Sequence, residues 1–229
     1  MSASASKRGT PMDKIAIPTN AKRCVVQVRH SHSVQEGPNE SRTLTTMGQI
    51  LCAAVAPDYE ELLKKLTERF GAPIFASSQY PRALLTAFLV TGANQIVMDE
   101  RLNLDASVKK APAPAGSPHP NLYAHWKDEG LGVPQMLQRL AADPSLFGNQ
   151  PVNEGIQRME DFVLNAFPES NLVIAFDHEP AISLYAAKCG MVAEKLGLTE
   201  CQAMIFFLDA AGNVISIEKF ESKATKGGD

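Results

Sequence analysis

Two histidines and two arginines follow segments that have the composition of buried strands. Arg29 and His30 come directly after the apolar run 24–28, and His178 stands two residues after the run 172–176. Arg82 lies in the segment that follows a third run, 73–76, and the serine pair 77–78. A guanidinium matches phosphate oxygens in pairs, and a neutral imidazole is a nucleophile or base near neutral pH. These residue types favour chemistry on a phosphate-like anion, provided that the fold joins the three strand ends.

A mostly parallel sheet would bring these ends together, because ligands bind outside the carboxyl ends of parallel strands. Strand-like runs alternate along the chain with amphipathic segments. Two further runs, 203–208 and 214–220, flank a turn at 211–213 and predict a hairpin. The fold class that we expect is α/β, a three-layer sandwich with a mostly parallel central sheet and flanking helices. A short strand is also expected at 96–98.

Capping residues and apolar spacing predict the helices. Thr45 caps a helix that ends near residue 56, and Asp58 caps a second helix that ends before Gly71. Pro180 opens a helix at its first position, where proline is favoured. Two more helices are expected near 134–142 and 153–167, the second with Asn153 as its cap.

One domain is expected over residues 23–220, between disordered tails at 1–22 and 221–229. Within it, the proline-rich stretch 110–120 excludes regular structure, so we interpret 103–134 as a flexible insertion or flap. Tyr123 and Trp126 in this insertion either form an apolar wall for a substrate or pin the flap to the domain.

Composition excludes several classes of function. The 229 residues are 45% hydrophobic and 21% charged, with a net charge of −3, which disfavours a nucleic-acid partner. No apolar stretch is long enough to span a membrane, and residues 1–22 lack the apolar centre of a secretory signal. The four cysteines lack zinc-site spacing and indicate reduced thiols. We therefore expect a cytoplasmic protein without metal or membrane contact; the oligomeric state is not readable.

Four segments, in order, resemble the histidine phosphatase superfamily, also called phosphoglycerate-mutase-like. They are VRHS at 28–31, RTLTTMG at 42–48, SSQYPRALLTA at 77–87 and DHEPAIS at 177–183. The short first loop and the His-Glu-Pro motif look most like the small phosphohistidine-phosphatase branch. The insertion at 103–134 makes this chain longer than is usual for that branch.

The resemblance implies a two-step mechanism that needs no cofactor. His30 would attack phosphorus and form a phosphohistidine, which water then hydrolyses. Arg29, Arg82 and His178 would bind the phosphate oxygens, with His30 neutral and His178 cationic. Arg42 either contacts the phosphate or anchors the loop. Ser31 stands where the family usually has glycine, so we count it as part of the phosphate loop.

The proton donor stays open among three carboxylates. The phosphoglycerate-mutase branch has a glutamate shortly after the third strand, but that position holds Leu104 here, between Glu100 and Asp105. The phytase-like branch places its acid directly after the second histidine, which corresponds to Glu179.

Three functions fit these residues. The first is a phosphohydrolase that acts on a small phosphomonoester or on phosphohistidine, so its partner is a phosphorylated small molecule or a phosphoprotein. The second is a phosphomutase of the phosphoglycerate-mutase type, which needs a closed basic pocket; residues 103–134 offer few positive charges beyond Lys109, Lys110 and Lys127. The third is a non-catalytic phospholigand-binding module, which would have no need of the nucleophile.

Overall fold

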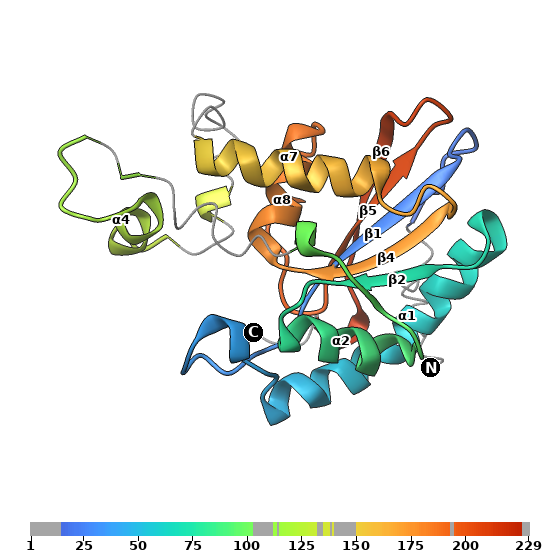
Figure 1. Cartoon of the computed structure of the whole chain (residues 1–229), viewed down its shortest axis with the longest axis horizontal. Coiled ribbons are helices and arrows are strands. Elements are labelled where there is room, and N and C mark those ends of the chain that lie inside the picture. Colours follow the sequence, from blue (N-terminus) through green and yellow to red (C-terminus); the bar gives the residue numbers. More distant parts are fainter. Residues whose placement is uncertain are drawn as a thin grey trace, which may run out of the picture.

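A single six-stranded sheet organises the chain (Figure 1). The computed structural model describes residues 15–102, 112–113, 115–131, 135–137, 139, 150–192 and 195–225. The strand order is β3-β2-β4-β1-β5-β6. The strands are β1 (Arg23–Arg29), β2 (Ile74–Ser77), β3 (Val97–Met98), β4 (Leu172–Asp177), β5 (Ala203–Leu208) and β6 (Val214–Phe220). β1, β2, β3 and β4 run parallel to one another, whereas β5 pairs antiparallel with both β1 and β6. The predicted mostly parallel sheet is confirmed.

Helices cover both faces of the sheet. α1 (Thr46–Phe70) and α2 (Pro81–Thr91) lie on one face, and α7 (Gln150–Asn165) and α8 (Glu179–Lys188) lie on the other (Figure 1). Successive residues of β1 point into different cores: Val25 packs with the α7–α8 side and Val26 with the α1–α2 side. This double burial explains why the parallel strands are continuous apolar runs in the sequence.

α1 is one continuous helix, so the predicted break between Thr45's helix and Asp58's helix is wrong. Pro57 lies inside α1. Apolar residues before and after it pack into the same core, and this packing holds the helix together across the proline. Asp58 does not cap a helix. Its carboxylate accepts hydrogen bonds from Ser222 Oγ at 2.6 Å and from Lys223 N at 2.8 Å. Among the described residues, no helix has both the length and the apolar character needed to cross a membrane.

Parts of both expected tails pack on the domain. Ile15 and Ala21 are buried in the α1–α2 core, and Lys65 Nζ donates to the Ile15 carbonyl at 2.9 Å. At the other end, Ser222 is buried and residues 223–225 form a short 3-10 helix, η5, against α1. Residues at both ends therefore contact the domain beyond the bounds 23–220 expected for it, which single apolar residues without periodicity did not indicate. Residues 1–14 and 226–229 lie outside the described part.

The insertion contains a helix that the sequence did not predict. α4 (Leu122–Asp128) begins after Asn121, whose side chain accepts from Ala124 N at 2.8 Å. Leu122 and Trp126 are buried in the α7–α8 core, so this part of the insertion is docked. Residues 103–111, 114 and 132–134 lie outside the described part, as does most of the helix expected at 134–142. Asn153 is not a cap, because α7 already includes residues 150–152.

Candidate active site

The carboxyl ends of β1, β4 and β2 meet at one edge of the sheet, as the sequence predicts. Arg29 lies opposite Asp177, and Ser77 lies opposite Phe176. The backbone connections continue past the strands: His30 N donates to the Asp177 carbonyl at 3.1 Å, and Ser78 N donates to the Phe176 carbonyl at 3.0 Å. The side chains that follow each strand therefore start from fixed, adjacent backbone positions.

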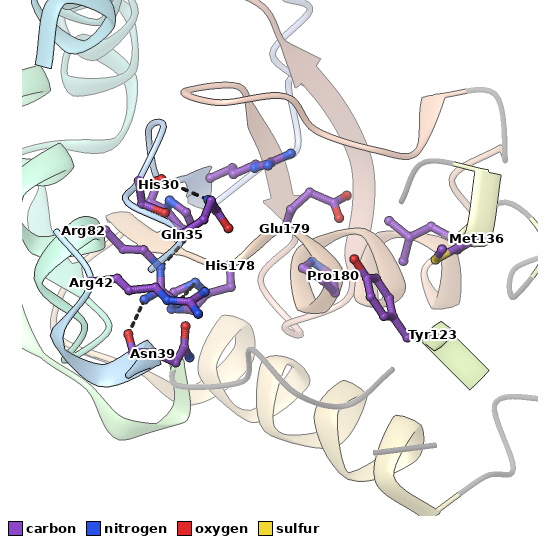
Figure 2. A pocket seen from close by; sticks show the side chains of 13 residues that line it. His30, Gln35, Asn39, Arg42, Arg82, Tyr123, Met136, His178, Glu179 and Pro180 are labelled. Atoms are coloured by element: carbon purple, nitrogen blue, oxygen red, sulfur yellow. Dashed lines mark hydrogen bonds between the residues drawn. The ribbon is translucent and has the colours of Figure 1, made fainter. Parts of the chain in front are cut away.

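A cavity of about 180 Å³ opens at this edge (Figure 2). Six of the candidate residues line it: Arg29, His30, Arg42, Arg82, His178 and Glu179. The other lining residues in the described part are Ser33, Gln35, Asn39, Tyr123, Met136, Leu137 and Pro180. Residues from both ends and the middle of the sequence thus share one space.

Hydrogen bonding fixes the tautomer of His30. Its Nδ1 lies 2.7 Å from the Ser31 carbonyl oxygen, which only accepts, so Nδ1 carries the proton. Arg82 Nε, which only donates, points at His30 Nε2 from 3.3 Å. The ring is therefore neutral, with the lone pair of Nε2 directed at the cationic side of the cavity. Orientation of one ring nitrogen by a carbonyl is how proteins prepare the other for chemistry.

Arg82 connects three parts of the site although its residue is only 3% exposed. Besides His30, it donates from Nη1 to the Asn39 carbonyl at 2.8 Å, and its Nη2 lies 3.4 Å from His178 Nδ1. The Tyr80 ring lies under the guanidinium, with 4.6 Å between the carbon centre and the ring centroid. A buried guanidinium held by such contacts is pre-oriented for an anion.

His178 is buried beside His30, with 5.0 Å between the ring centroids. Its Nε2 lies 3.2 Å from Ser78 Oγ. Because the Arg82 guanidinium can only donate, His178 Nδ1 accepts in this arrangement, and the ring is neutral. A cationic ring was expected from the sequence. A bound phosphate would take over as the acceptor of Arg82, so the cationic form stays a prediction for the phosphate complex.

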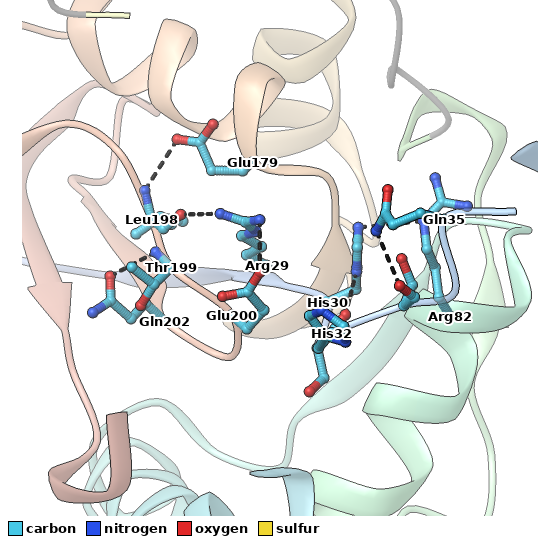
Figure 3. A network of polar contacts seen from close by, with 12 residues as sticks. Arg29, His30, His32, Gln35, Arg82, Glu179, Leu198, Thr199, Glu200 and Gln202 are labelled. Carbon is cyan, nitrogen blue, oxygen red and sulfur yellow. Dashed lines mark hydrogen bonds and ion pairs between the residues drawn. The ribbon is translucent and has the colours of Figure 1, made fainter. Parts of the chain in front are cut away.

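Arg29 is held from the opposite side by the loop that precedes β5 (Figure 3). Its Nη2 forms an ion pair with Glu200 Oε1 at 3.0 Å, and its Nη1 donates to the Leu198 carbonyl. The Arg29 side chain is 25% exposed and lines the cavity. One edge of the guanidinium is thus fixed by protein acceptors.

Glu179 is buried in the cavity wall and its carboxylate points toward Leu198 (Figure 3). Oε1 accepts from Ser183 Oγ at 2.6 Å and from Leu198 N at 3.1 Å, whereas Oε2 has no hydrogen-bond partner among the described residues. Burial raises the pKa of this carboxyl above its ordinary value, although Ser183 and the charge of Arg29 act in the opposite direction. The group thus retains its proton at a higher pH than an exposed glutamate.

The loop between His30 and α1 is anchored by Ser31 and Gly48. Ser31 is buried; its N donates to Thr86 Oγ1 at 2.9 Å and its Oγ donates to the Gly48 carbonyl at 2.8 Å. A Cβ on Gly48 would lie 2.1 Å from the His32 carbonyl oxygen, so only glycine fits there. Ser31 does not line the cavity, and its side chain holds the loop against α1 instead.

Arg42 anchors the loop, as one of the two alternatives proposed, and its contact with a phosphate stays a prediction. Its Nε donates to the Gly37 carbonyl at 3.1 Å, which ties the loop together, and its side chain also lines the cavity.

The other two acid candidates are not placed in this cavity. Glu100 is exposed in the 3-10 helix η3 (Glu100–Leu102) and borders a separate depression with Met98 and Arg101. Asp105 lies outside the described residues. Within the described part, no group of three or more His, Cys, Asp or Glu residues could hold a metal ion.

Several site residues escaped the sequence analysis. Gln35 and Asn39 are ordinary polar loop residues, and Asn39 contributes its backbone carbonyl, which has no sequence signature. Glu200 contacts Arg29 from 171 positions away. Tyr80 is different: its position two residues before Arg82, at the N-cap of α2, was a usable signal.

Comparisons with known proteins give a fold. No family model matches the sequence, and no curated protein matches it at a significant level. A protein characterised from an open reading frame of Mycobacterium tuberculosis is 14% identical, with a TM-score of 0.57; the match covers 88% of this chain and 98% of that one. Phosphoglycerate mutase from Bacillus anthracis strain Sterne is 15% identical, with a TM-score of 0.53 and coverage of 90% and 95%. Mycobacterial glucosyl-3-phosphoglycerate phosphatase is 16% identical, with a TM-score of 0.52 and coverage of 87% and 98%.

The three matches cover nearly the whole of this chain and nearly the whole of each neighbouring chain. The chain therefore has the phosphoglycerate-mutase-like fold that its motifs suggested. At 14–16% identity the match carries no assignment of activity, which has to be argued from the side chains in the cavity.

Proposed function

We propose that this chain is a phosphohydrolase that uses His30 as its nucleophile. The observation that carries the proposal is the state of this imidazole. Nδ1 donates to the Ser31 carbonyl, so the lone pair of Nε2 faces a cavity that three arginine side chains line. A neutral imidazole whose Nε2 lone pair is oriented toward the Arg82 guanidinium suits attack on phosphorus, because the cation that will bind the phosphate already lies beside the attacking atom.

In the first step, Nε2 of His30 attacks phosphorus in line with the ester oxygen. The P–N bond forms and the P–O bond to the leaving group breaks. Arg82 and Arg29 bind the equatorial oxygens, and their charge offsets the negative charge of the transition state. Arg82 already points Nε at the attacking atom, so a phosphoryl group on Nε2 would lie within its reach.

The leaving oxygen needs a proton, and Glu179 is the candidate acid that lines the cavity. Its raised pKa keeps it protonated at a pH where an exposed carboxyl has ionised. In the second step, water attacks phosphorus, the P–N bond breaks and His30 keeps the electron pair. A proton of the water passes to the Glu179 carboxylate, and inorganic phosphate leaves.

The test is hydrolysis of p-nitrophenyl phosphate in EDTA. We expect turnover by the natural chain, a loss of at least about 10³-fold in His30→Ala, and activity within about twofold in His32→Ala. His32 is a matched control, because it lies in the same loop but is exposed and bonded to Thr45. Full activity of His30→Ala would refute the proposed nucleophile.

A phosphomutase would keep the phosphoryl group on His30 until an acceptor arrives. The structural neighbour from Bacillus anthracis is a phosphoglycerate mutase, which makes this the second candidate. Alkaline quenching after addition of a labelled phosphate donor distinguishes the two. Label that disappears in water alone supports hydrolysis, whereas label that persists until a sugar phosphate is added supports the mutase. A binding module would show neither label nor turnover.

A further inference from the structure

The cavity has two unlike ends. Arg42 and Arg82 line the end beside His30, whereas Tyr123 and Met136 line the other end (Figure 2). Figure 2 shows this division, with His30, Arg42 and Arg82 together on one side, Tyr123 and Met136 on the other, and Glu179 and Pro180 between them. A phosphoryl group held at the first end directs its leaving group toward the second.

The apolar end is part of the packed core. Met136 is 3% exposed and Leu137 is 1% exposed, and both belong to the hydrophobic core of the α7–α8 side. Leu122 and Trp126 of α4 are buried in the same core. Tyr123, between them, is half-buried and turns to the cavity. A wall held in this way is preformed, so it presents apolar surface before any ligand arrives.

The charged side chains are also distributed unequally between the two ends of the cavity. Among the described lining residues, His30, Arg42, Arg82 and His178 lie together at the phosphoryl end (Figure 2), and the guanidinium of Arg29 is bonded to Leu198 and Glu200 beside Glu179 (Figure 3). The Glu179 carboxyl lies between these groups and the apolar wall (Figure 2). A carboxylate on the leaving group would lose water there without gaining a cation, which is costly. A flat apolar group would instead bury its surface against Tyr123, Met136 and Leu137, which is favourable.

We propose, on the basis of the phosphohydrolase function above, that the preferred substrates are phosphomonoesters whose leaving group is uncharged and carries one aromatic or similarly flat apolar ring. A cavity of about 180 Å³ limits the size of this group. Cavities of about 150 Å³ accept a single benzene ring. Phosphoglycerates and other carboxylate-bearing phosphates are poor substrates on this proposal.

The test compares esters whose leaving oxygens have similar intrinsic reactivity. Benzyl phosphate, glycerol 3-phosphate and 3-phosphoglycerate are all alkyl esters, so differences in kcat/KM report recognition of the leaving group. We expect kcat/KM for benzyl phosphate to exceed that for glycerol 3-phosphate by at least about tenfold, and that for 3-phosphoglycerate by more.

Substitution of Tyr123 by a cation is expected to weaken this preference. Tyr123→Lys places a cation at the apolar end and is expected to raise the ratio of kcat/KM for 3-phosphoglycerate to that for benzyl phosphate by about tenfold. Phe88→Lys is the matched control, because Phe88 is an aromatic side chain that is 41% exposed on α2. We expect it to leave the ratio unchanged, and thermal unfolding of both variants checks that they fold.

Failure of this proposal differs from failure of the proposed function. Equal kcat/KM for the three esters, or preference for 3-phosphoglycerate, would overturn the substrate class while hydrolysis stands. Absence of turnover with every ester would overturn the hydrolase. In that case calorimetry with benzylphosphonate and with 3-phosphoglycerate still tests the wall: tighter binding of benzylphosphonate supports it, and tighter binding of 3-phosphoglycerate overturns it.

Discussion

The two ends of the cavity are built by different kinds of structure. The phosphoryl end is placed by the parallel register of β1, β4 and β2, in which backbone hydrogen bonds fix where His30, Ser78 and His178 begin. The apolar end is built on side-chain packing, through α4 and through Met136 and Leu137 of the inserted segment. On the proposed function, the reacting groups would lie on the rigid edge of the sheet, and substrate recognition would lie on a segment whose sequence can change without disturbing that edge.

The largest effect is expected from Arg82, which belongs entirely to the phosphoryl end. Arg82→Lys removes the planar guanidinium that contacts His30, Asn39 and Tyr80 at once. We expect kcat/KM for p-nitrophenyl phosphate to fall about 10³-fold. Arg158→Lys, an exposed change on α7, is the control and should stay within about twofold. An equally small change in Arg82→Lys would show that the sheet edge does not carry the chemistry.

A leucine pair tests whether the apolar end is truly core. Leu137→Ala is expected to lower the free energy of unfolding by about 3 kcal/mol, because Leu137 is 1% exposed. Leu89→Ala removes the same atoms from a side chain that is 44% exposed on α2 and should cost less than about 1 kcal/mol. Urea denaturation measures both values. Similar losses in the two variants would mean that the wall is not preformed.

A smaller effect on activity is expected from Glu200, which supports the phosphoryl end from outside. Glu200→Gln weakens the ion pair with Arg29 and should lower kcat/KM about fivefold, chiefly through KM. The free energy of unfolding should change by less than about 1 kcal/mol, since both partners are partly exposed. The exposed Glu61→Gln is the control for charge. A large loss of stability without a change in KM would contradict a positioning role.

The smallest effect concerns pH and Glu179, which lies between the two ends. Burial raises the pKa of its carboxyl in the folded state, so the folded chain holds this proton more tightly than the unfolded chain does. The stabilisation is complete below the ordinary glutamate pKa and is lost as pH rises through the folded-state pKa. Glu179→Gln stays neutral throughout. We therefore expect the unfolding free energy of the natural chain to fall relative to that of the variant as the pH rises above the ordinary glutamate pKa.

Denaturation of both proteins by urea at several pH values measures this difference. A constant difference across these pH values would mean that Glu179 titrates as an exposed carboxyl does, and its proposed role as proton donor would lose its support.

The elements that the sequence predicted well are those that are determined by residues close together in the sequence. The run 172–176 is apolar throughout because β4 is buried on both faces, and the positions of His30 and His178 just beyond such runs located the phosphoryl end. The helix end expected near residue 56, with a new helix from Asp58, was wrong for the opposite reason: Pro57 lies inside α1. A local helix breaker was overridden by apolar residues on both sides of it that pack on the same sheet face.

The sequence by itself thus determined the α/β layering and the identity of the histidines and arginines, because periodicity and residue type act within a few positions of the chain. Only the tertiary structure decided the tautomer of His30, the contact between Arg29 and Glu200, and the apolar wall opposite them. These features join residues that are distant in sequence or involve backbone carbonyls that every residue has. Their partners are therefore selected by how the layers pack, and no local pattern encodes that choice.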